Sequence, residues 1–204
     1  MTLLNTTQAE EVSQAIAQAE QQTDAELIVV LAKQADEYYY IPTLWAALLS
    51  LLTPAALQFA PFWLNINETL TTQFLVFIGA ALVFRIPGLM RLLIPARVKK
   101  QRANLLARAM FLENNLHHTK EESGVLIFVS EFEHYIEIIA DRGINAKVES
   151  TQWTQLVDEF VHAVQSKQTH QGMLNMVSQC GNLLNTHVPA TAEKNELPNH
   201  LIQI

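Results

Sequence analysis

A long stretch without charge in the first half of the chain limits the possible folds more than any other feature. Residues 38–67, thirty in a row, carry no formally charged side chain, and after Glu68 a second apolar stretch over residues 70–94 is interrupted only by Arg85 and Arg91. A helix needs about 20 mostly apolar residues to cross the roughly 30 Å hydrocarbon core of a bilayer. We therefore predict a transmembrane hairpin over residues 41–95, with helices over about 42–64 and 69–94.

The charges around this hairpin predict its orientation. Seven of the thirteen Lys and Arg residues fall between positions 85 and 108, where no acidic residue occurs. Because basic residues accumulate on the cytoplasmic side of membrane helices, we expect a multi-pass protein with two spans and both termini in the cytoplasm. At the membrane interface we expect two tryptophans near the ends of the first span and three arginines facing anionic headgroups: Trp45, Trp63, Arg85, Arg91 and Arg97.

The second span is short and contains helix-breaking residues. Only sixteen uncharged residues, 69–84, precede Arg85, so the span must extend past this arginine, whose long stem lets the guanidinium reach the headgroups. Pro87, Gly88 and Pro95 follow. We expect them to kink or end the helix.

Composition excludes some classes of partner. The net charge is −7, and outside residues 85–108 the acidic residues outnumber Lys and Arg about three to one, which argues against nucleic-acid binding. The single cysteine, Cys180, cannot form an intrachain disulfide, as expected for a reducing compartment. We expect it to be a small side chain packed in a helix.

The segments on either side of the hairpin, residues 5–37 and 96–188, are long enough together for one small domain. Three apolar runs predict buried strands at residues 26–32, 124–130 and 135–140, with a hairpin turn at 131–134. Helical spacing predicts a first helix that starts at a Thr7–Glu10 capping box, a basic helix reaching about His118, and two later helices around Trp153–Val164 and Met173–Leu184. These elements indicate an α/β fold, a small α/β/α sandwich, with residues 189–204 as a flexible tail.

This order of elements resembles the TPM-domain family. The resemblance is carried by Thr23-Asp24-Ala25-Glu26 before the first strand, Gly124-Val125-Leu126-Ile127 in the second and Asp141-Arg142-Gly143-Ile144 after the third, and it extends over about residues 5–188. It also resembles the compact bacterial branch of the family, whose members carry a membrane hairpin inserted in the domain. The resemblance implies two activity classes, because some members are calcium-binding acid phosphatases while others act in photosystem repair or receptor assembly.

Ligand sites of α/β sheets lie at the carboxyl ends of strands, which makes Asp36, Glu131, Asp141 and Arg142 candidates. We expect Glu131 and Asp141 to hold a divalent metal such as calcium, with Arg142 meeting a phosphate or carboxylate and Gly143 permitting close backbone approach. In the alternative interpretation, Asp141 caps the next helix and Arg142 pairs with a carboxylate. Glu137 lies inside an apolar strand, and we expect it at an edge or facing solvent. No side chain is assigned a catalytic role.

Two functions follow. The preferred one is a non-enzymatic membrane protein that presents a cytoplasmic TPM-like domain as a binding or assembly and quality-control module for other membrane proteins. The alternative is a weak phosphatase that depends on a divalent metal at the strand ends. The expected partners are the lipid bilayer and another membrane protein, and a homo-oligomer is left open.

Overall fold

The fold is taken from a computed structural model, which describes residues 4–59, 64–191 and 200–204. The chain divides into two compact units, one formed by residues 1–35 and 100–204 and the other by residues 36–99. The first is the α/β unit and the second is the hairpin unit. The hairpin unit is thus inserted between two parts of the α/β unit, as the sequence predicts.

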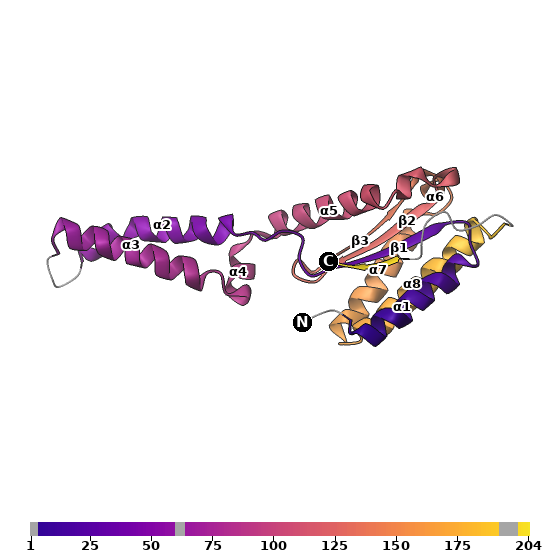
Figure 1. Cartoon of the computed structure of the whole chain (residues 1–204), viewed down its shortest axis with the longest axis horizontal. Coiled ribbons are helices and arrows are strands. Elements are labelled where there is room, and N and C mark those ends of the chain that lie inside the picture. Colours follow the sequence, from indigo (N-terminus) through magenta and orange to yellow (C-terminus); the bar gives the residue numbers. More distant parts are fainter. Residues whose placement is uncertain (1–3, 60–63, 192–199) are drawn as a thin grey trace. The chain divides into compact units, whose positions relative to one another are not determined.

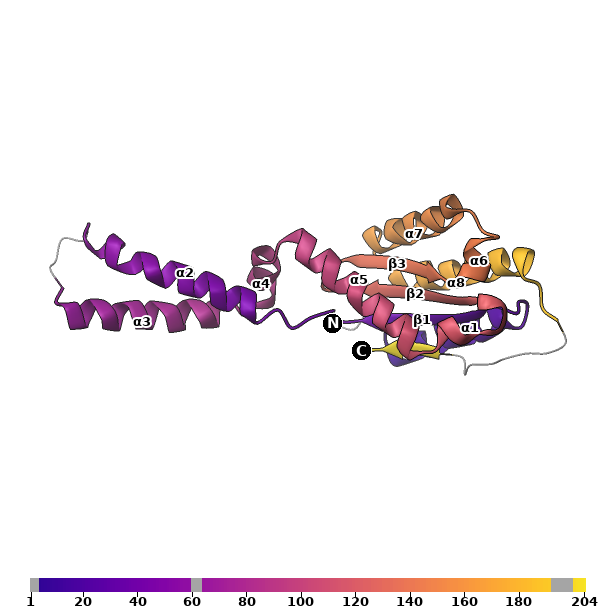
Figure 2. The same ribbon diagram turned by 90° about the horizontal axis from the view of Figure 1, so that it is seen from above.

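The α/β unit is built on a four-stranded sheet in the order β3-β2-β1-β4 (Figures 1 and 2). The strands are β1 (Glu26–Ala32), β2 (Gly124–Ser130), β3 (Tyr135–Ala140) and β4 (His200–Gln203). β1 runs parallel to both β2 and β4, whereas β3 is antiparallel to β2. All seven residues of β1 and of β2 are buried, because strands in the middle of a covered sheet have no solvent face.

Helices cover both faces of the sheet, so the predicted α/β/α sandwich is confirmed. Helices α1 (Thr6–Glu20), α7 (Ser150–Gln165) and α8 (Thr169–His187) lie on one face, and α5 (Ala96–Glu113) lies on the other. Successive residues of a strand point to opposite faces of the sheet, so they pack into two separate hydrophobic cores. Leu27, Val29 and Leu31 point toward the three-helix side, where Cys180 is also buried, while Ile28, Val30 and Ala32 meet Ala103, Ala107 and Phe111 of α5. Burial raises the pKa of the Cys180 thiol to about 12, as befits a packed cysteine.

Three features of the helices differ from the prediction. The first helix is capped by Asn5 and Gln8 rather than by Thr7 and Glu10, because the Asn5 side chain accepts the N–H of Gln8 at 2.9 Å. Helix α5 ends at Glu113 rather than near His118. Two residues later Asn115 takes a left-handed conformation (φ 57°), and the short helices η1 (Leu116–His118) and η2 (Lys120–Glu122) follow. A four-residue helix, α6 (Arg142–Asn145), is the third difference.

The predicted flexible tail over residues 189–204 is wrong at both described ends. Residues 200–203 form β4 on the free edge of β1, and the N–H of Thr191 is bound by both carboxylate oxygens of Asp24 at 2.9 and 3.0 Å. A four-residue strand carries too little hydrophobic pattern to be recognised, since strands are found by alternation over longer runs.

The hairpin unit consists of α2 (Tyr40–Leu57), α3 (Ile66–Val83) and the short α4 (Pro87–Leu93). Helices α2 and α3 are each long and apolar enough to cross a membrane, and α3 has no buried residue. Both are shorter than the predicted spans. The predicted break at Pro87 is confirmed, because α3 ends before Arg85 and α4 begins with this proline at its first turn.

Close packing of α1 against α8 yields a stability prediction. A Cβ added to Gly181 would lie 2.6 Å from the Cβ of Ala19, so Gly181→Ala forces the two helices apart. We expect the free energy of unfolding to fall by about 1–3 kcal/mol in urea denaturation. Adding Ala19→Gly removes the opposing methyl group and should restore part of this loss. Asn185→Ala, at an exposed position of α8, is the control, and equal stability of all variants would contradict the packing.

Candidate functional site

The two carboxylates predicted to share a metal ion lie at opposite ends of the sheet. Glu131 follows the carboxyl end of β2, and its N–H binds the carbonyl of Ala32 at 2.9 Å. Asp141 follows β3, which is antiparallel, so its N–H binds the carbonyl of Gly124 at the start of β2. Six residue steps of strand, about 20 Å, separate the two ends. The predicted shared site is therefore wrong, because ligands of one calcium ion lie within about 2.6 Å of it.

Asp141 acts as a helix cap. Its Oδ1 accepts the N–H of Arg142 at 2.7 Å at the start of α6, as the alternative interpretation of the sequence has it. Its other oxygen, Oδ2, is buried and has no hydrogen-bond partner within the described residues. Arg142 is exposed. A Cβ on Gly143 would overlap the carbonyl oxygen of Glu121, so Gly143 serves a close approach between two backbone segments.

At the other end of the sheet, a buried carboxylate holds the β2–β3 turn. Glu133 is 9% exposed and accepts the N–H of Ala35 at 3.0 Å and the hydroxyl of Ser130. This residue was missed by sequence reasoning, which treated residues 131–134 only as a turn. Asp36 belongs to the hairpin unit, where its carboxylate accepts the N–H of Tyr38 at 3.3 Å.

A polar network joins α5 to the outer strand β3. The Tyr135 hydroxyl donates to Glu137 at 2.7 Å, and the amide of Asn104 donates to both carboxylate oxygens of Glu137 at 2.8 and 3.0 Å. Glu137 lies on an edge strand, as expected. Burial, followed by the hydrogen bond to Glu137, raises the pKa of Tyr135 to about 12. Three hydrogen bonds from neighbouring donors engage the Glu137 carboxylate, so Glu137 orders the α5–β3 contact.

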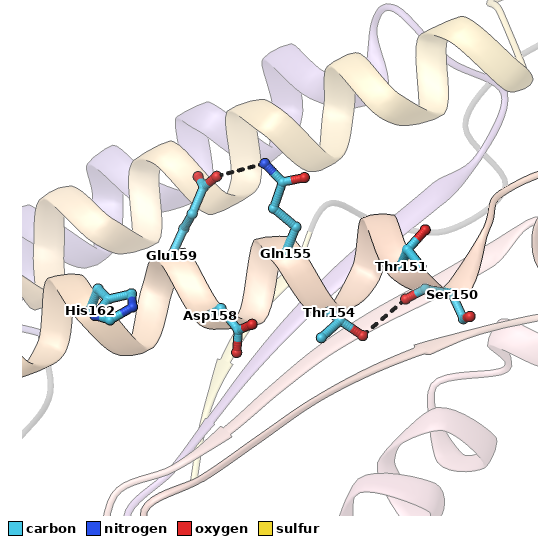
Figure 3. Close-up of a pocket in the computed structure, with 7 residues that line it drawn as sticks. All are labelled: Ser150, Thr151, Thr154, Gln155, Asp158, Glu159 and His162. Atoms are coloured by element: carbon cyan, nitrogen blue, oxygen red, sulfur yellow. Dashed lines mark hydrogen bonds between the residues drawn. The ribbon is translucent and has the colours of Figure 1, made fainter.

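The surface depression shown in Figure 3 lies along one helix. It has a volume of about 360 Å³, and seven side chains of α7 line it: Ser150, Thr151, Thr154, Gln155, Asp158, Glu159 and His162. Hydrogen bonds from Gln179 and Gln155 lower the pKa of Glu159, which stays fully exposed. In Figure 3 the labelled side chains extend from successive turns of the same helix. They do not converge on one point from several elements, as the groups of a catalytic site do.

Metal-ligating side chains are likewise dispersed. Within the described residues, no three His, Cys, Asp or Glu side chains come together in a geometry that could hold a metal ion. The carboxylates of Glu133 and Glu137 are instead engaged by protein donors. Calcium thus stays a prediction drawn from the resemblance alone.

The residues predicted for the membrane interface lie in the hairpin unit. The indole of Trp45 donates to the carbonyl of Leu93 at 3.3 Å, and the guanidinium of Arg85 lies over the Tyr39 ring at 5.5 Å. The ammonium of Lys99 donates to the carbonyl of Arg91, and Arg97 is exposed. Trp63 lies outside the described residues. Aromatic and basic side chains therefore gather near the α2 start and α4, as they do at membrane interfaces.

Comparison with known proteins supports the fold. Residues 89–183 match the family model of the TPM domain. The chain is also similar to the NMR structure of the BA42 protein from the psychrophilic bacterium Bizionia argentinensis, with 17% identity and a TM-score of 0.60 over 98% of this chain and 94% of that one. No curated protein matches the chain significantly. At this identity the structural likeness extends to the fold and not to activity.

The Tyr135 network predicts a loss of stability at alkaline pH. Because the pKa of Tyr135 is about 12 in the folded chain and 10.0 ordinarily, its contribution is complete below pH 10 and is lost as pH rises toward 12. Tyr135→Phe should lower the free energy of unfolding by about 1 kcal/mol at pH 8 and reduce the fall between pH 8 and pH 11. Urea denaturation at both pH values measures this. Tyr40→Phe, at a half-exposed position, should leave the fall unchanged.

The separation of the two carboxylates predicts independent metal responses. Calcium binding is measured by calorimetric titration of the solubilised protein. If Asp141→Asn abolishes a heat of calcium binding, Glu131→Gln should still show that heat. Loss of the same saturable binding in both single variants would contradict the opposite placement of Glu131 and Asp141.

Proposed function

We propose that this chain, whose residues 89–183 match the family model of the TPM domain, is a membrane-anchored module whose α/β unit binds other membrane proteins during their assembly or quality control. The anchor is the hairpin unit, and the α/β unit lies in the cytoplasm with both termini. The observation that carries this proposal is the apolar surface of α2 and α3.

That surface is too hydrophobic to be left in water. Large apolar side chains on both helices are well exposed, including Leu51 at 65%, Leu52 at 64% and Phe74 at 61%. Burying such side chains is worth about 1.5–3 kcal/mol each, so a surface of this extent needs a nonaqueous neighbour. A bilayer supplies it for two adjacent helices whose backbone hydrogen bonds are internal.

The orientation rests on charge. Arg85, Arg91, Arg97 and Lys99 follow α3 within the hairpin unit, while the α2–α3 connection contains no Lys or Arg. The positive-inside tendency then assigns the end that carries the α/β unit to the cytoplasm.

A binding role is supported by the outer surface of α5. Leu105 and Leu112 are 51% and 55% exposed. They lie seven residues apart, two turns along one face of the helix, whereas Ala103, Ala107 and Phe111 of the same helix are buried. The phosphatase alternative has no comparable support, because its two carboxylates lie at opposite ends of the sheet.

The proposal predicts stable membrane association and crosslinks to other membrane proteins. In native membranes, the chain should resist alkaline carbonate extraction. A photo-crosslinking amino acid at Leu105 or Leu112 should give discrete adducts with membrane proteins, and the same amino acid at Asn185, an exposed position on α8, serves as the matched control.

Release of the chain by carbonate would contradict the anchor. The absence of adducts at every position tested across the α/β unit would contradict the binding role. Hydrolysis of a phosphate monoester by the wild type that is lost in a folded Asp141→Asn variant would establish the phosphatase instead.

A further inference from the structure

The edge of β1 that does not pair with β2 is covered by β4, a strand from the far end of the sequence. β4 pairs with β1 from Ile28↔His200 to Leu31↔Gln203. The N–H of Ile204 donates to the carbonyl of Leu31 at 3.0 Å, and the N–H of Lys33 donates to the carbonyl of Ile204 at 2.7 Å. In a parallel pair the backbone groups of every second residue make such bonds. The N–H and C=O of Ile202 therefore face β1, as those of Ile204 do, whereas the N–H and C=O of Gln203 face outward.

β4 is held much less firmly than the other neighbour of β1. It pairs over four residues, whereas β2 pairs over seven. Leu201 contacts the three-helix core and Ile202 contacts the α5 core, but both stay partly exposed. Small buried area and few paired residues place such a strand at the low end of local stability.

Release of β4 leaves the rest of the α/β unit anchored. The segment before it is fastened separately, by Thr191 to Asp24 and by the N–H of Ala190 to the carbonyl of Gln22 at 3.1 Å. These contacts lie at the opposite end of β1 from Lys33. The strand can therefore detach without displacing α8.

The uncovered edge would not stay empty. The N–H of Leu27 is capped by the buried carboxylate of Glu20 at 3.1 Å, so the edge N–H groups that depend on β4 are those from Val29 to Lys33. β1 is apolar from Leu27 to Ala32, and an exposed edge with unpaired backbone groups pairs readily with another extended chain.

We propose that this edge of β1 is a peptide-binding site at which β4 acts as a built-in competitor. This inference rests on the proposed function. The peptide that binds at the β1 edge is an extended, uncharged segment of a membrane partner, and it adds to the sheet as a parallel strand. Two adjacent aliphatic residues would take the places of Leu201 and Ile202, one in each core. Backbone hydrogen bonds supply affinity and these two positions supply selectivity.

The test compares two proline variants of the full solubilised chain. Ile202→Pro removes an N–H that points at β1, while Gln203→Pro removes one that points outward, which edge strands tolerate. The probe is a fluorescein-labelled synthetic peptide with the sequence of residues 198–204. Because a tethered competitor suppresses binding, Ile202→Pro should bind the probe about tenfold or more tightly than the wild type does, and Gln203→Pro should resemble the wild type. A peptide with proline in place of the residue equivalent to Ile202 should not bind.

Equal affinity of wild type and Ile202→Pro, both unfolding cooperatively, would overturn the proposal. Hydrogen exchange on the unmodified chain provides a second measurement in case the variant does not fold. Excess probe should speed exchange in residues 200–204 while the amides of Leu31 and Lys33 stay protected, and an unchanged β4 would overturn the proposal. Crosslinks to membrane proteins without displacement of β4 by the probe would rule out this site and leave the proposed function standing. Displacement of β4 by the probe without crosslinks would leave this site standing and contradict the proposed function.

Discussion

The parallel pairing of β1 with β2 is the constraint on which the rest of the structure depends. It extends from Glu26↔Gly124 to Ala32↔Ser130 and joins two segments that are separated by the whole hairpin unit. Both strands are buried along their full length, so neither has a stable place without the other. The alternation of side chains along them assigns α1, α7 and α8 to one core and α5 to the other. A hairpin can be inserted in their connection because a parallel crossover must leave the sheet in any case.

Much of this architecture could be predicted from local patterns. The almost continuous apolar runs of β1 and β2 and the helical spacing of Trp153, Leu156 and Phe160 are strong signals, because each element buries a face of its own. The membrane hairpin was predicted from its lack of charge. The second helix is shorter than expected, since Pro87 divides the second apolar stretch. β4 was missed because its position depends on the edge of β1 rather than on its own four residues.

The candidate site was predicted less well, for a geometric reason. A turn at residues 131–134 makes β3 antiparallel to β2, and therefore carries Asp141 away from Glu131. The sequence contained that information, but treating all strand ends as one edge is valid only for parallel strands. Glu133 and the Asn104–Glu137 contact were invisible for another reason, since hydrogen bonds between distant segments leave no periodic trace in a sequence. Their role is to fix the turn and the outer strand against neighbouring elements.

The insertion of the hairpin between β1 and β2 also sets an order of events during synthesis. Residues 33–123, ninety-one in all, must be translated after β1 is complete and before β2 begins. At about 5–20 residues per second, this takes on the order of 5–20 seconds. Over that interval β1, which is apolar from Leu27 to Ala32, is without its main neighbour while the hairpin unit that separates the two strands is synthesised. The topology therefore delays the pairing that buries β1 until the whole hairpin unit has been made.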